Sequence, residues 1–271
     1  MNETLMRKKS RFLRELNAVW AIMARDITIF IKSPSTIIMS FAMPIIMMGM
    51  IGGNLMQNMT SGLGTTFGSY MLVGMIVNMM FMMTSMNMTS LVEDHQTDFT
   101  QEMLISPVSR YSIVIGKIFG SMFGSIISLL ATMIVGLCMG ISLTIYQFLI
   151  ILAFSPLMCL AGGALAMILI GSIKSNKVAN FAVMIITMPQ MFLSGAIIPI
   201  TSSTGVLWFL SRILPMTYCL DLMRSMVFHG SAIYSKAILF NPFVNLIAII
   251  SITVICLVIG TYFFARSEKN K

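Results

Sequence analysis

Hydrophobic residues along the chain gather into six long runs that are separated by short polar segments. Each run is close to the roughly 20 apolar residues that a helix needs to cross a bilayer. The runs predict transmembrane helices at residues 35–56, 69–91, 112–139, 146–171, 178–199 and 241–264. Since a backbone in lipid must satisfy its own hydrogen bonds, we expect an all-α integral membrane protein, with one transmembrane domain over residues 1–271.

The segment before the first run, residues 11–32, has a different pattern. Its apolar residues recur at steps of three or four, at Phe12, Leu16, Val19, Met23, Ile27 and Phe30. Charged residues take the other faces, and Trp20 suits the membrane interface. We interpret the segment as an amphipathic helix lying on the cytosolic membrane surface. The alternative, an extension of the first span, conflicts with Pro34, which should break the helix.

The positions of the basic residues orient the six predicted spans. With both termini in the cytosol, fourteen of the 17 Lys and Arg residues lie inside, seven of them before the first run. Three would lie outside, namely Arg212, Arg224 and Lys236. Because Lys and Arg accumulate in the cytoplasmic segments of membrane proteins, we expect both termini to be cytosolic.

The composition agrees with a membrane protein and disfavours several other classes. The chain is 57% hydrophobic and 10% charged, with a formal net charge of +8. A nucleic-acid-binding protein would gather its basic residues on one folded face. Here seven precede the first run and the others are thinly spread over the span ends, so we expect no nucleic-acid partner. His95 and His229 are isolated and the four cysteines lack metal-ligand spacing, so we expect no metal site.

The sequence offers no pattern for handling a fuel or for catalysis. It has no G-x-x-x-x-G-K-[ST] phosphate loop, and no carboxylate lies in the middle of a predicted span. No nucleophile–base set stands out, so we expect neither catalytic residues nor a cofactor bound by this chain. A membrane-embedded lipid enzyme that uses Asp221 and His229 is a weak alternative for the same reason.

The segment between the second and third runs, residues 93–110, carries the clearest interaction pattern. With spacings of about four residues, an acidic stripe and an apolar stripe would run side by side on a helix. The acidic stripe is Asp94, Asp98 and Glu102, and the apolar stripe is Phe99, Met103 and Leu104. Pro107 disfavours helix at Ser106, so the helix should end near Ile105. The pattern indicates a helix that docks another protein, with a solvated charged loop as the alternative.

Residues 200–240, after the fifth run, are too apolar for a free loop on the outside. Pro189, Gly195 and Pro199 also interrupt the fifth run itself. Broken backbone at membrane depth is tolerated where it is buried in protein or lines a cavity. We therefore expect the fifth span to break near Ser194–Gly195, with re-entrant helices following on the extracellular side.

Two charged residues in this outer region belong to one predicted helix. Asp221 and Arg224 are three residues apart, so a helix would place their side chains next to each other. We predict a direct pair that braces the region, with a contact to lipid headgroups as the alternative.

The second run combines methionines with asparagines. Methionine is soft and adaptable, and an asparagine is costly to expose to lipid, so this helix has one polar, deformable side. A substrate path along it would use Met75, Asn78, Met79 and Met86. The alternative is that the methionines are flexible packing inside the protein.

Two stretches of motif residues point to one family when they are taken together. The first consists of Phe99, Glu102-Met103-Leu104, Ser106-Pro107-Val108-Ser109-Arg110 and Gly116-Lys117. The second consists of Pro189, Phe192-Leu193-Ser194-Gly195-Ala196-Ile197-Ile198-Pro199, Trp208, Pro215-Met216-Thr217-Tyr218, Asp221 and Arg224. Over nearly its whole length the chain resembles the type-2 ABC exporter permeases, especially the daunorubicin-resistance-like branch. One departure is Asp98, where the family often has glycine.

The resemblance implies a permease of a bacterial cell membrane that exports a hydrophobic or amphipathic substrate, such as a drug, an antibiotic or a lipid. A role in multidrug resistance would follow. Two permeases, identical or homologous, would pair among the membrane lipids. Each would bind a separate ATP-binding-cassette ATPase subunit, which holds the ATP and Mg²⁺. A non-transporting scaffold or sensor that binds a cytosolic regulator is the alternative function.

The resemblance also assigns roles to residues. A cytosolic coupling helix, roughly Thr97–Ile105, would enter a groove on the ATPase. The docking residues would be Asp94, Asp98, Phe99, Glu102, Met103, Leu104, Ser106, Pro107 and Arg110. The outer gate would consist of Phe192, Ser194, Gly195, Pro199, Pro215, Tyr218, Asp221 and Arg224. The second and fifth spans would line the substrate path.

Overall fold

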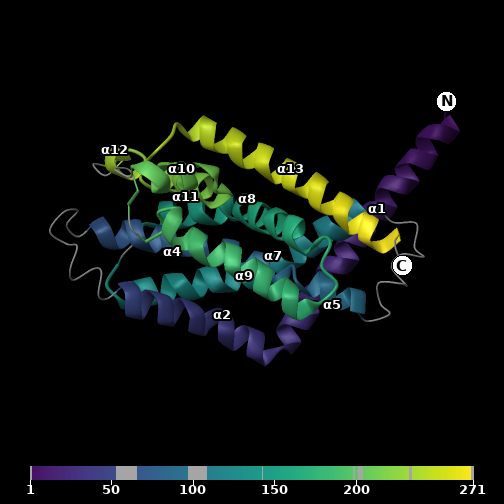
Figure 1. The fold of residues 1–271 in the computed structure, drawn as a ribbon, viewed down its shortest axis with the longest axis horizontal. Coiled ribbons are helices and arrows are strands. Elements are labelled where there is room, and N and C mark those ends of the chain that lie inside the picture. The colour runs from purple at the N-terminus through teal and green to yellow at the C-terminus, as the bar shows by residue number, and fades with distance from the viewer. Residues whose placement is uncertain are drawn as a thin grey trace.

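The computed structural model describes residues 2–52, 66–96, 109–141, 143–197, 199–200, 204–231 and 234–269. Every regular element within these ranges is a helix, which confirms the all-α prediction. The longer helices run roughly side by side along the long axis of the molecule, as Figure 1 shows. The chain begins and ends at the same end of this bundle, which we call the terminal end. The opposite end is called the distal end.

The first two helices are separated by a sharp bend. Helix α1 is Asn2–Lys32 and helix α2 is Pro34–Ile46, and the angle between them is 79°. Pro34 begins α2 because its fixed φ suits a first helical turn, where the missing N–H is not needed. A π-helical segment, η1 (Met47–Gly52), follows. The break predicted at Pro34 is therefore present, whereas the position of α1 on a membrane surface stays a prediction.

Helix α1 packs along helix α7, Arg110–Cys138. Glycines on α7 permit this close approach. A Cβ on Gly116 would lie 3.1 Å from the backbone oxygen of Val19, and one on Gly120 would lie 2.7 Å from the Cβ of Asp26. Small residues let helices in a membrane protein come close together, and here they hold α1 against α7 within one chain.

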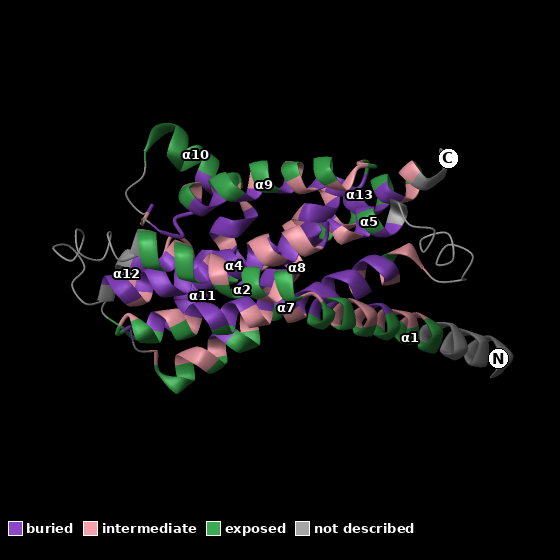
Figure 2. Ribbon diagram, turned by 90° about the horizontal axis from the view of Figure 1, so that it is seen from below, coloured by how far each residue is buried: buried purple, intermediate pink, exposed green. Residues whose placement is uncertain are grey.

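The core of the bundle is organised around α4, Thr66–Asn87. Its neighbours are α7, α8 (Ile145–Ile170), α9 (Asn176–Leu193) and α11 (Pro215–Val227). Burial is extensive on α4 and α11, which are largely purple in Figure 2. The methionines Met71, Met75 and Met79 of α4 are each at most 2% exposed. Along this part of α4 the methionines therefore fill the core.

Within the described part of the chain, four helices are long and apolar enough to cross a membrane. They cover Phe67–Asp94, Arg110–Cys138, Ile145–Ile170 and Pro242–Ser267, and the last belongs to α13, Pro242–Lys269. Up to six spans result if the bent pairs α1–α2 and α10–α11 each count as one. Helix α9, the predicted fifth span, is not among the four, because polar residues such as Asn176, Asn180 and Gln190 lower its mean hydropathy. The chain is thus a multi-pass membrane protein.

The distal end carries the short helices. Helix α9 ends at Leu193, and Gly195 follows with φ +84°, a left-handed conformation that glycine adopts at little cost. Helix α10, Gly205–Ile213, then meets α11 at an angle of 83°, and α12, Tyr234–Ala237, comes after them. The helix break predicted near Ser194–Gly195 and the short helices after it are therefore present. Their depth in a membrane stays a prediction.

Candidate functional site

A network of four charged side chains lies at the terminal end. Arg25 and Asp26 come from α1, Asp94 from α5 (Ser90–Gln96) and Lys117 from α7. Arg25 donates two hydrogen bonds to the Asp94 carboxylate, at 2.7 and 3.0 Å. The Lys117 ammonium donates to Asp94 Oδ2 at 2.6 Å and to Asp26 Oδ1 at 3.0 Å. We call these four residues the ionic network, and it joins three helices.

Three side chains of the ionic network are largely removed from solvent, whereas the Arg25 side chain is 28% exposed. Lys117 is 2% exposed and Asp94 is 7% exposed. Charges in such surroundings are costly unless each has an opposite partner and hydrogen bonds, which this arrangement supplies. Asp94 was expected to face a cytosolic partner as part of the acidic stripe, but its carboxylate binds inside the chain. A lysine in a predicted span needs an acidic partner, and Lys117 was the signal in the sequence for this network.

The start of α7, on the other side of residues 97–108, is also anchored. Both carboxylate oxygens of Glu15 accept hydrogen bonds from the backbone N–H of Ser109, at 3.1 and 2.9 Å. A carboxylate at a helix N-terminus is favoured by the unpaired N–H groups and the helix dipole. Arg110 donates to the backbone oxygen of Ala265 near the end of α13, at 2.9 Å. The described residues on both sides of 97–108 are thus bound to α1, α7 and α13.

Most of the predicted docking helix lies outside the described residues. These undescribed positions are Asp98, Phe99, Glu102, Met103, Leu104, Ser106 and Pro107. Of the docking set, the structure describes Asp94 and Arg110, and both make contacts within the chain. The docking role of the segment therefore stays a prediction.

A cavity of about 550 Å³ lies beside the ionic network. It is lined by residues of α1, α5 and α7, by the start of α2, the end of α4 and the start of α9, and by all four residues of the ionic network. Its size is in the range of small-molecule sites. Phe30 and Met86 form apolar parts of the wall, whereas Asn87, Asn176 and Asn180 form polar parts. The cavity could accommodate a molecule with both an apolar and a polar portion.

Of the predicted path residues, Met86 alone lines this cavity. Met75 and Met79 are buried in the core of the bundle. Asn78 is 1% exposed and donates a hydrogen bond to the sulfur of Met216 at 3.6 Å. These three residues are thus buried within the bundle and do not line the cavity, and their role in a substrate path stays a prediction.

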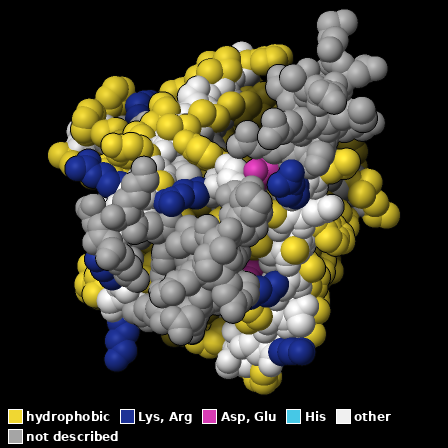
Figure 3. All heavy atoms as spheres, turned by 90° about the vertical axis from the view of Figure 1, so that its right-hand side faces the viewer, with side chains coloured by type: hydrophobic (Ala, Val, Ile, Leu, Met, Phe, Trp, Pro, Cys, Tyr) yellow, Lys and Arg dark blue, Asp and Glu magenta, His cyan; other side chains and the backbone are white. Residues whose placement is uncertain are grey.

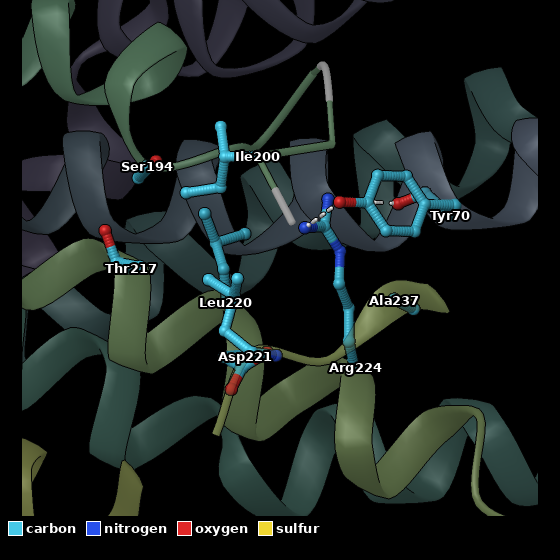
Figure 4. Close-up of a pocket in the computed structure, with 9 residues that line it drawn as sticks. Tyr70, Ser194, Ile200, Thr217, Leu220, Asp221, Arg224 and Ala237 are labelled. Atoms are coloured by element: carbon cyan, nitrogen blue, oxygen red, sulfur yellow. Dashed lines mark hydrogen bonds between the residues drawn. The ribbon is translucent and has the colours of Figure 1, made fainter. Parts of the chain in front are cut away.

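A second polar cluster lies at the distal end, around Arg224 of α11. Arg224 is 3% exposed, and it donates to the Tyr70 hydroxyl at 2.7 Å and to the backbone oxygen of Ala196 at 3.1 Å. Figure 4 shows its side chain extending from α11 toward Tyr70. A buried guanidinium needs such acceptors, and here they tie α11 to α4 and to the turn after α9.

The predicted direct pair between Asp221 and Arg224 is wrong. Asp221 Oδ1 accepts from the backbone N–H of Leu239 at 2.7 Å, and Oδ2 accepts from Phe240 N–H at 2.8 Å and from Asn245 at 2.7 Å. The carboxylate is thus satisfied by the chain that leads into α13, and the guanidinium by α4 and the turn after α9. The two residues are neighbours on α11, but each binds a different part of the distal end.

The structure brings several predicted gate residues together. Ser194, Asp221 and Arg224 line one small cavity of about 10 Å³, about the least space that admits a single water molecule. Tyr218 donates from its hydroxyl to the backbone oxygen of Arg212 at 2.6 Å and so fixes the α10–α11 bend. Three other predicted gate residues do not line this small cavity. Pro215 is the first residue of α11, Phe192 is 56% exposed on α9, and Pro199 does not line the cavity.

The close approach of the turn after α9 to α4 depends on Gly74, which the sequence did not reveal. A Cβ on Gly74 would overlap the backbone oxygen of Ala196 and would lie 2.6 Å from Arg224 Nη2. Tyr70, one helical turn earlier on α4, accepts the hydrogen bond from Arg224. Both residues belong to a long apolar run, so nothing in the local pattern marked them.

Comparison with protein-family models matches residues 17–228 to ABC2_membrane, described as the ABC-2 type transporter family. This range holds both polar clusters except for the partners of Asp221 at Leu239, Phe240 and Asn245. A search of curated proteins finds no significant match.

Proposed function

The chain belongs to the ABC-2 type transporter family, and from that premise we propose that it is the permease subunit of an ATP-binding-cassette exporter. Family members are membrane components of transporters and generally work with ATP-binding-cassette ATPase subunits. In our proposal two copies of this chain, or this chain and a homologous one, pair in a bacterial cell membrane. Two ATPase subunits bind the ATP and Mg²⁺ on the cytosolic side.

The observation that carries the proposal is the attachment of the chain on both sides of residues 97–108. Before this segment, Asp94 is held by Arg25 and Lys117. After it, Ser109 is held by Glu15. Any displacement of the segment would act directly on α1 and α7. A segment with such attachments is suited to pass a movement from a docked ATPase into the bundle.

The proposed cycle uses the two ends of the molecule differently. At the terminal end, which we place in the cytosol, ATP-driven closure of the ATPase subunits moves residues 97–108. A hydrophobic or amphipathic substrate occupies the mixed polar and apolar cavity beside the ionic network. At the distal end, which we place outside, the turn after α9 and helices α10 and α11 form the gate. Membership of the daunorubicin-resistance-like branch, six spans and a role in multidrug resistance belong to this proposal.

The test is recovery of an ATPase subunit with the tagged chain from its native membranes, quantified by mass spectrometry. Phe99→Ala combined with Met103→Ala removes two apolar side chains from the predicted docking helix. Each would contribute roughly 1.5–3 kcal/mol if it is fully buried, so recovery should fall by at least about a hundredfold.

The matched control is Asp98→Ala, which removes one charge from the same segment. An exposed ion pair contributes about 0–1 kcal/mol, so recovery with this variant should fall by no more than about fivefold. Undiminished recovery with the double variant would refute docking through this segment. Recovery of a kinase or another regulator in place of any ATPase would instead support the scaffold or sensor function.

A further inference from the structure

A second cavity, of about 300 Å³, lies at the terminal end between the turn after α8 and the last turns of α13. Its walls are Ser172 and Lys174 from the turn and Phe263, Arg266 and Ser267 from α13. It shares no lining residue with the cavity beside the ionic network. The two cavities are therefore distinct, and the role proposed for the first does not extend to the second.

This second cavity lies at the level where two candidate spans end. The span on α8 ends at Ile170 and the span on α13 ends at Ser267. On the membrane side of the cavity the two helices are in close contact, since a Cβ on Gly171 would lie 2.8 Å from the backbone oxygen of Gly260. Beyond this contact the cavity lies between the turn after α8 and the end of α13, close to the ends of the two candidate spans.

The lining suits an anionic group. Lys174 and Arg266 contribute two positive charges, and two serines contribute hydroxyl donors. None of the described residues that line the cavity carries a carboxylate. Figure 3 shows the terminal end, where the dark-blue Lys and Arg side chains clearly outnumber the magenta acidic ones. An anion that enters the cavity would meet two basic side chains and two hydroxyl groups.

The surroundings favour an anion that is attached to hydrocarbon. Phe263 lines the cavity and is 41% exposed. The apolar face continues along α13 toward the middle of its span, with Tyr262 at 57%, Ile259 at 40% and Ile255 at 55% exposed. A free phosphate would make no use of this face, whereas the acyl chains of a lipid would cover it.

We propose that this cavity binds the phosphate headgroup of an anionic membrane lipid, whose acyl chains lie along α13. Basic pockets between transmembrane helices on the cytoplasmic side are a recurring form of lipid headgroup site. The lipid would join the turn after α8 to the end of α13, and Arg110 at the start of α7 binds the same end of α13. The proposal concerns lipid binding by this chain alone and does not depend on transport or on an ATPase.

The experiment measures binding of dioleoylphosphatidylglycerol to the purified chain in detergent by native mass spectrometry. Lys174→Gln combined with Arg266→Gln removes the two positive charges of the cavity. Each basic residue near an anionic lipid is worth about 1 kcal/mol, so binding should weaken roughly thirty-fold. The matched control, Lys32→Gln with Lys177→Gln, removes two exposed charges that line neither cavity. It should weaken binding by less than about threefold.

Three further measurements complete the test. Lys174→Arg with Arg266→Lys conserves the charges and should bind within about threefold of the unchanged chain, which separates lost charge from lost folding. Dioleoylphosphatidylcholine should bind far more weakly, and inorganic phosphate should not displace the bound lipid. The proposal would be overturned if the Gln double variant bound the lipid fully or if the control lost as much binding. It would also be overturned if the zwitterionic lipid bound equally well or if inorganic phosphate displaced the lipid.

Discussion

Lys117→Met tests the ionic network, because it replaces a buried cation with an apolar side chain of similar length. The Lys117 ammonium lies 2.6 Å from Asp94 Oδ2 and 3.0 Å from Asp26 Oδ1, and the residue is 2% exposed. Without it, two carboxylates share Arg25, which is 3.7 Å from Asp26. Removing one partner of a buried pair costs about 3–5 kcal/mol. We expect ~3 kcal/mol, because Arg25 still donates two hydrogen bonds to Asp94.

The assay is equilibrium unfolding of the purified protein in mixed micelles, followed by far-UV circular dichroism. The matched control is Lys177→Met, which removes an exposed lysine of α9 and should change the free energy of unfolding by no more than about 0.5 kcal/mol. Asp94→Asn combined with Lys117→Met should cost less than the sum of the two single changes, since the residues interact directly. If the Lys117→Met protein were as stable as the unchanged chain, the claim that the ionic network stabilises the packing of α1, α5 and α7 would be refuted.

Two further substitutions test the distal end by thermal unfolding. Gly74→Ala should cost about 1–3 kcal/mol, because its Cβ would overlap the backbone oxygen of Ala196. Gly49→Ala, whose Cβ would meet nothing within 4 Å, is the control, and an equal effect of both would contradict the close approach. Tyr70→Phe should cost about 1.5–3 kcal/mol, since it removes the acceptor of a 2.7 Å hydrogen bond from buried Arg224. An unchanged midpoint would show that this bond contributes little.

Local features of the fold were predictable from the sequence. The bend at Pro34 and the break at Gly195 follow from the backbone restrictions of proline and from the conformations open to glycine. The long apolar runs correctly predicted helices close to the positions where the structure has them. Helix α9 was placed less well, because it ends at Leu193, before the break at Gly195, whereas the predicted span continued to residue 199.

Contacts between distant segments were not predictable. The spacing of Asp221 and Arg224 correctly made them neighbours on α11 but could not reveal their partners. Arg224 binds Tyr70, which is 154 residues earlier, and Asp221 binds Asn245 and the backbone before α13. Likewise, the acidic pattern around Asp94 indicated a charged helix face. It could not show that Lys117 and Arg25 approach that carboxylate from two other helices.

The account's central claim is that this chain receives its driving force from a separate ATPase. The most direct measurement is the rate of ATP hydrolysis in lipid vesicles that contain either the purified chain alone or the chain with its co-purified ATPase subunits. We predict no hydrolysis above that of empty vesicles for the chain alone, and vanadate-sensitive hydrolysis for the complex. Vanadate-sensitive hydrolysis by the purified chain alone would contradict the account.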